Sequence, residues 1–179
     1  MNNTKRGQVW IETVIYLLIG LGVLGLLLTF IKPQIDSSID KNLIEKSIET
    51  LNTIDSTINE IYYTAGNTRT LTLTIKKGNL LINSTDDAII LTIPNSKYEY
   101  SELDREINLT GTRISALTTQ TREVTTVTLT LDYSQYLNIT YNTQETNKEI
   151  QNSDSAYTLI INNKGIIENV TNIDLRVAE

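Results

Sequence analysis

The chain has 179 residues and contains neither cysteine nor histidine. Without cysteine it can form no disulfide, no thiolate metal site and no cysteine nucleophile. Without histidine it lacks the commonest general base and the commonest zinc ligand. Ser-His-Asp and Cys-His catalysis are therefore excluded, while a carboxylate-based hydrolase and an all-oxygen cation site remain compatible with the composition.

Positive charge is also scarce, with 15 Lys and Arg against 21 Asp and Glu and a net charge of −6. Phosphate binding needs a stripe or patch of Lys and Arg, and the sequence contains none. We therefore expect no nucleic-acid partner. Beyond its first third the chain is rich in Thr, Asn, Ile and Leu, a composition that suits a β-rich domain with a polar surface.

An uncharged, mainly apolar run extends from Thr13 to Ile31. At about twenty residues it meets the length needed to span a bilayer. Lys5 and Arg6 precede the run, and the carboxylates Asp36 and Asp40 follow it. The positive-inside rule predicts a single-pass membrane precursor whose N-terminus is cytoplasmic and whose remainder lies outside.

Two features distinguish this run from an ordinary secretory signal. Lys32-Pro33-Gln34 follows it where a small-residue cleavage site would stand. Glu12 lies at the start of the apolar segment, where an isolated charge in hydrocarbon costs about 2.5–3.5 kcal/mol on insertion scales. We expect some group to compensate this charge.

The order Lys5-Arg6-Gly7-Gln8, with Glu12 five residues after the glycine and an apolar helix beyond, resembles the class III leader of archaeal type IV pilins. The resemblance implies that a membrane prepilin peptidase cuts between Gly7 and Gln8, so that the apolar helix stays on the mature protein. Archaellins usually carry small residues where Trp10 and Glu12 stand, a departure that favours a pilin or pilin-like protein.

The resemblance further implies a structural role without enzymatic activity or cofactor. The expected partners are other copies of the chain in an extracellular filament, the prepilin peptidase, an assembly ATPase, a platform membrane protein and the membrane itself. Adhesion and motility are both compatible with such a filament, and both a major and a minor subunit fit the sequence.

Elementary electrostatics supports a role for Glu12 independently. Cleavage would free an α-amino group on Gln8, whose reference pKa near 7.7–8.0 makes it largely cationic at neutral pH. Breaking a buried pair of this kind costs about 3–5 kcal/mol, so the pair would fix the register between packed helices. Pairing within one chain is an alternative, as is a first-turn glutamate favoured by the helix dipole by about 0.3–1 kcal/mol.

Residues 20–25 match G-x-G-x-x-G, the dinucleotide-binding fingerprint. That fingerprint requires a preceding strand and a βαβ unit, whereas these glycines lie inside the apolar run. We interpret them as sites of close helix approach or as ordinary glycines of a membrane helix.

The pilin resemblance implies a cleaved leader (1–7), and together with the spacing of apolar residues it predicts an α+β protein that continues with a transmembrane or filament-core helix (8–32), an amphipathic stalk helix (33–65) and an extracellular β domain (67–179). Between Gln34 and Tyr63 apolar residues recur every three or four positions. Pro33 would either kink the helix or begin a second one. The expected arrangement is the lollipop of type IV pilins, with the helix packed on an antiparallel sheet or sandwich.

After Gly66 the apolar residues alternate with polar ones, which predicts seven to nine strands. The clearest runs are 70–75, 127–133, 137–141 and 173–177, and shorter strands are expected around 88–93 and 157–161. Lys77-Gly78-Asn79 and Asn163-Lys164-Gly165 have the composition of hairpin turns.

Four asparagines outside the span begin N-x-[ST] triplets: Asn83, Asn108, Asn138 and Asn169. About four such triplets are expected by chance, so their number carries no signal, although alternation predicts that Asn108 and Asn138 face outward. The carboxylates of Asp86-Asp87, Asp104, Glu106 and Asp132 are interpreted as solvated loop charges, because none forms a calcium-loop pattern. The tyrosines of the predicted strands, Tyr133 among them, are interpreted as half-buried residues with a wet hydroxyl.

A second function fits the same sequence. A signal-anchored surface binding protein would use the apolar run as a permanent anchor and would never polymerise. An anchored extracellular enzyme is a third class, for which the sequence offers no catalytic constellation.

Overall fold

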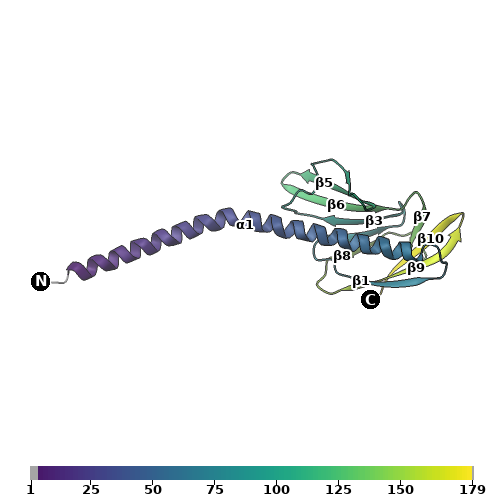
Figure 1. The fold of residues 1–179 in the computed structure, drawn as a ribbon, viewed down its shortest axis with the longest axis horizontal. Coiled ribbons are helices and arrows are strands. Elements are labelled where there is room, and N and C mark those ends of the chain that lie inside the picture. Colours follow the sequence, from purple (N-terminus) through teal and green to yellow (C-terminus); the bar gives the residue numbers. More distant parts are fainter. Residues whose placement is uncertain (1–3, 179) are drawn as a thin grey trace. The chain divides into compact units, whose positions relative to one another are not determined.

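The computed structural model describes the backbone of residues 4–178 and the side chains from Trp10 to Ala178. Residues 1–3 of the predicted leader lie outside the described residues, as do the side chains of Lys5, Arg6, Gly7 and Gln8. The chain forms two compact units, Met1–Ile39 and Asp40–Glu179. One helix, α1 (Thr4–Ile61), begins in the first unit and ends in the second, and Pro33 lies within it (Figure 1).

Ten strands follow α1 in the described part of the chain and form two sheets. The four-stranded sheet has the order β1-β9-β10-β7, and the six-stranded sheet has the order β4-β5-β6-β3-β2-β8. Their bounds are β1 Thr68–Leu73, β2 Asn79–Asn83, β3 Ala88–Ile93, β4 Ile107–Asn108, β5 Ile114–Thr121, β6 Val124–Asp132, β7 Leu137–Tyr141, β8 Lys148–Gln151, β9 Tyr157–Ile167 and β10 Val170–Ala178.

The part of α1 that belongs to the second unit shares one hydrophobic core with both sheets. Five of its side chains have no exposed surface and recur at helical intervals of seven, three, four and three: Ile44, Leu51, Ile54, Ile58 and Ile61. From Ile44 onward the apolar stripe predicted for the stalk helix thus lies in the core, whereas its first two predicted members, Ile35 and Ile39, are exposed. A helix packed on a β-sheet domain confirms the α+β class.

One strand pair differs from the antiparallel prediction. β7 runs parallel to β10, with Leu137 opposite Thr171 and Tyr141 opposite Leu175. The chain leaves β7, forms β8 in the other sheet and returns through β9, so β10 reaches β7 by a crossover connection. Parallel neighbours require such a crossover, which local alternation in the sequence cannot reveal.

Both predicted hairpin turns are wrong. Asn163-Lys164-Gly165 lies inside β9, where Gly165 has φ +89° beside a register shift in the β9–β10 pair; the turn itself is Glu168-Asn169. Gly78 does occupy a turn, with φ +84°, but β1 and β2 belong to different sheets. A glycine with positive φ marks a bulge or a sheet-to-sheet crossing as readily as a hairpin.

We predict that Gly78→Ala destabilises the β domain far more than Gly111→Ala. Both glycines have positive φ, which costs about 1–2 kcal/mol for an alanine. A Cβ on Gly78 would lie 1.8 Å from the Thr92 carbonyl oxygen, whereas one on Gly111 meets nothing within 4 Å. Relieving that clash should cost about 1–3 kcal/mol more. Denaturant unfolding of the full chain in detergent measures both variants, and equal losses would contradict the prediction.

Candidate functional site

The apolar part of α1 is exposed throughout its described length in the first unit. Every side chain from Trp10 to Ile35 is exposed, including the sixteen large apolar ones between Trp10 and Ile31. Burying a large apolar side chain stabilises by about 1.5–3 kcal/mol, which gives roughly 25–50 kcal/mol for the set. A domain is stable by only about 5–15 kcal/mol, so this segment requires an apolar environment that its own fold does not supply.

A bilayer is one such environment. Within Trp10–Ile61, α1 is long and apolar enough to cross a membrane by length and composition. The apolar run predicted from the sequence to span a membrane thus lies in a continuous helix of sufficient length.

The helical period distributes the side chains of this segment over distinct faces. At about 100° per residue, Trp10, Leu17, Leu21, Leu24 and Leu28 share a leucine-rich face. Glu12 lies on the opposite face, with Tyr16, Val23 and Phe30 at helical spacing along that face. The single carboxylate therefore belongs to a face whose other members are aromatic or aliphatic.

The three glycines of this segment are not required by the chain's own packing. A Cβ built on Gly20, Gly22 or Gly25 meets nothing within 4 Å. Each glycine nevertheless costs a helix about 1 kcal/mol relative to alanine. The G-x-G-x-x-G motif lies within α1, which is not the strand-turn-helix context of a dinucleotide site.

Counting from Trp10, where the described side chains begin, Asp40 is the first buried residue of α1, and it ties the helix to loops next to the six-stranded sheet. Its carboxylate accepts a hydrogen bond from Lys77 Nζ at 2.6 Å and another from the backbone N–H of Lys97 at 2.7 Å. A charge-assisted pair with both partners held by the fold is among the stronger polar contacts. The exposed face of the helix gives way to a buried one at this residue, where the second unit begins.

A second polar contact joins α1 near its C-terminal end to the residue that follows β6. The Tyr133 hydroxyl donates to Asp55 Oδ1 at 2.9 Å, and Arg113 donates to the same oxygen at 3.1 Å. Arg113 also donates to the Asn59 side chain and lies 5.0 Å above the Tyr136 ring. Tyr133 has no exposed surface, so the interpretation of a wet hydroxyl is wrong for this residue. Burial raises the pKa of the Tyr133 phenol well above its ordinary value, and neighbouring Asp55 raises it further.

The third contact closes the C-terminal end of α1. The Asn163 side-chain amide donates to the carbonyl oxygens of Ile61 at 2.7 Å and Tyr62 at 2.8 Å. Ile61 is the last residue of α1 and Tyr62 follows it, so neither carbonyl has a partner within the helix. Asn163 in β9 therefore ends the helix and explains its stop at Ile61.

The structure brings together some of the loop carboxylates and not others. Asp86, Asp87 and Asp132 line one cavity of about 570 Å³, whereas Asp104 and Glu106 are not among its lining residues. Burial raises the pKa of the Asp87 carboxyl, and nearby carboxylates raise this pKa further. The hydrogen bond that Asp87 accepts from the Ile139 N–H acts in the opposite direction and lowers the pKa. Among the described residues, no group of three His, Cys, Asp or Glu has the arrangement of a metal site.

The four N-x-[ST] asparagines differ in accessibility. Asn83 is buried and exchanges two hydrogen bonds with Asp86, so a glycan could not be attached without breaking that turn. Asn138 is half-buried, while Asn108 and Asn169 are exposed. The outward orientation predicted by alternation is therefore fully met by Asn108.

Sequence reasoning missed the anchoring residues Asp40, Asp55 and Asn163. All three are polar residues in patterns whose apolar members carry the periodic signal. Asp40 and Asp55 are each next in sequence to exposed helix residues, so their pattern resembles that of solvated charges. Asn163 was assigned to a turn. A carboxylate on the border of an apolar stripe was the available signal.

We predict that Tyr133→Phe removes part of the alkaline loss of stability. Above pH about 10 the unfolded chain releases the Tyr133 proton while the folded chain keeps it, so stability falls by about 1.4 kcal/mol per pH unit. The variant should be less stable than wild type at pH 7, because a hydrogen bond to a carboxylate is lost, by about 1.5–3 kcal/mol. That gap should shrink as pH rises from 9 to 11.

Tyr63→Phe is the matched control, since Tyr63 is 91% exposed. It should follow the wild-type curve in denaturant unfolding at each pH. A constant gap between Tyr133→Phe and wild type would contradict the assignment of a buried, protonated phenol.

No protein-family model matches the chain, and no match is found among curated proteins or solved structures.

Proposed function

We propose that the chain is a structural subunit of an extracellular, type IV pilus-like filament, processed after Gly7 and assembled through its apolar helix. The observation that carries the proposal is the exposure of every described side chain from Trp10 to Ile35. Glu12 stands at the start of that segment, four residues after Gln8 of the Lys5-Arg6-Gly7-Gln8 sequence. The apolar helices of neighbouring copies would bury one another, and the β domains would form the outer surface.

Helix packing alone does not select a register, because leucine-rich surfaces fit at several staggers. A buried Glu12 does select one, since each stagger but one leaves its charge unpaired. The cation that meets it is the α-amino group of Gln8 on a neighbouring copy. Removal of the leader creates this amine, so processing and assembly are coupled.

A non-polymerising surface protein anchored by the same helix is the rival function. The apolar segment serves a permanent anchor equally well. The two functions differ in the fate of the leader and in the need for Glu12, and both differences are measurable.

We predict that the mature protein begins at Gln8. N-terminal sequencing or intact mass measurement of the cell-surface product decides this directly. A product that keeps its first seven residues would contradict the proposal and support the permanent anchor.

We predict that Glu12→Ala lowers filament abundance at least about tenfold, because an unpaired buried amine costs several kcal/mol at every subunit contact. Asp36→Asn is the matched control: it also removes one carboxylate from α1, but beyond the apolar segment. It should leave filaments intact. Both variants are compared by electron microscopy and by the amount of sheared surface material, at equal levels of precursor.

A further inference from the structure

The β9–β10 hairpin extends beyond its neighbours in the sheet. The ladder between β1 and β9 ends at Asn162, and β7 pairs with β10 only from Thr171. The remaining tip exposes three aliphatic side chains: Ile166 at 75%, Ile167 at 52% and Val170 at 40%. Ile167 and Val170 are opposite one another in the β9–β10 pair and share one face of the hairpin, and Ile166 projects from the other face. The end of the hairpin is therefore apolar on both faces, which points to an interaction surface.

Turn chemistry does not account for these aliphatics. Glu168 and Asn169 both have positive φ, 51° and 68°, which a two-residue hairpin turn of this hand requires. That requirement concerns the turn residues and places no demand on their flanks. The β5–β6 hairpin has a two-residue turn as well, Arg122-Glu123, yet its flanks are Thr121 and Val124.

The same domain contains a groove of complementary chemistry between α1 and the edge strand β1. The groove has a volume of about 400 Å³. Its apolar lining includes the buried side chains of Leu73, Ile75 and Leu91. Lys46, Lys76 and Lys77 lie on its lining with a single carboxylate, Glu49, so the rim carries a net positive charge.

Of these three lysines, Lys46 is the one whose charge is left for a partner. Lys77 pairs with Asp40 at 2.6 Å, and Lys76 lies 3.6 Å from Asp154. Lys46 is exposed and has no ion-pair partner within 4 Å among the described residues. An apolar tip that ends in an acid, Glu168, matches an apolar groove bordered by a free lysine.

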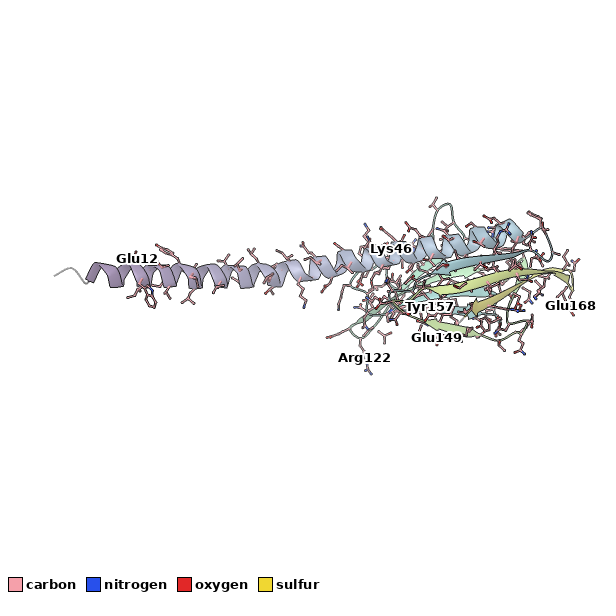
Figure 2. All side chains as sticks on the ribbon, turned by 90° about the horizontal axis from the view of Figure 1, so that it is seen from below. Glu12, Lys46, Arg122, Glu149, Tyr157 and Glu168 are labelled. Carbon is pink, nitrogen blue, oxygen red and sulfur yellow. The ribbon has the colours of Figure 1, made fainter. Side chains whose placement is uncertain are left out.

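The tip cannot reach the groove of its own chain. Lys46 and Glu168 lie well apart in the β domain, with Glu168 at its far tip (Figure 2). We propose that the β9–β10 tip of one copy docks into the α1–β1 groove of a second copy, with Ile166 and Ile167 in the groove and Glu168 beside Lys46. The inference rests on the proposed filament function and deepens it by naming an outer contact between subunits.

Such a contact joins two different surfaces, so it is heterologous. A projecting apolar group that fits a pocket elsewhere on the same molecule repeats from copy to copy, and it forms an open fibre when the rotation does not close. In a filament this contact would add to the packing of the apolar helices. Each β domain would bind one neighbour through its tip and another through its groove.

Cysteine cross-linking tests this contact, because the chain has no cysteine of its own. Ser47→Cys lies in the groove and Val170→Cys lies at the tip. The full chain carrying both is produced in cells and treated with a short bismaleimide. We expect a ladder of dimers, trimers and longer products, whereas either single variant can give dimers at most.

The matched control pairs Ser47→Cys with Val124→Cys. Val124 follows the β5–β6 turn as Val170 follows the β9–β10 turn, and the two are exposed to a similar extent, 43% and 40%. This pair should give no ladder. An equal ladder from the control would overturn the inference, as would products that contain a different protein.

Charge reversal gives a second readout. Glu168→Lys in the double-cysteine chain should lower the ladder about two- to fivefold, the effect of one exposed ion pair. Adding Lys46→Glu should restore it. No loss on reversal, or no recovery in the paired variant, would overturn the placement of Glu168 beside Lys46.

The outcomes separate this inference from the proposed function. Normal filaments of processed chains without a ladder would overturn the docking contact and leave the filament role in place. A chain that keeps its leader and gives no ladder would overturn both.

Discussion

The structure depends on a stretch of helix that its own fold leaves uncovered. From Trp10 to Ile35 no described side chain is shielded, although most of the residues are large and apolar. The free energy of exposing these side chains to water is several times the free energy of unfolding of an ordinary domain. The first unit therefore needs an apolar environment, such as a bilayer or the helices of other copies. The carboxylate of Glu12 favours an environment that also supplies a cation.

The second unit is built to hold the remainder of that helix firmly. Asp40 and Asp55 of α1 bond to residues of the β domain, and Asn163 of β9 donates to carbonyl oxygens at the end of α1, so the buried part of the helix is fixed at three places. Between these points five residues without exposed surface fill the core. A helix held at several places by the β domain suits the proposed function, in which the helix joins a filament and the β domain forms the outer surface.

The sequence predicted the long helix, the switch to strands after Gly66 and the core face of α1, because each is written as a local period. Strand β3 was predicted to the residue, at Ala88–Ile93. Partnership between strands was not predictable, since alternation says which side is buried and nothing about the neighbour. For this reason the sequence did not predict that β1 and β2 belong to different sheets or that β7 and β10 are parallel. For the same reason Asn163-Lys164-Gly165 was wrongly predicted to be a turn. The Asp55–Tyr133 contact joins residues 78 positions apart, a distance at which a single sequence carries no pairing signal.

A density map of the isolated filaments would show directly what surrounds the apolar helix. We expect residues 10–31 of neighbouring copies to pack together away from solvent, with the Glu12 carboxylate within about 4 Å of a Gln8 amino group, the usual limit for an ion pair. A map in which Glu12 faces water, or in which the apolar segments lie apart from one another, would contradict this expectation.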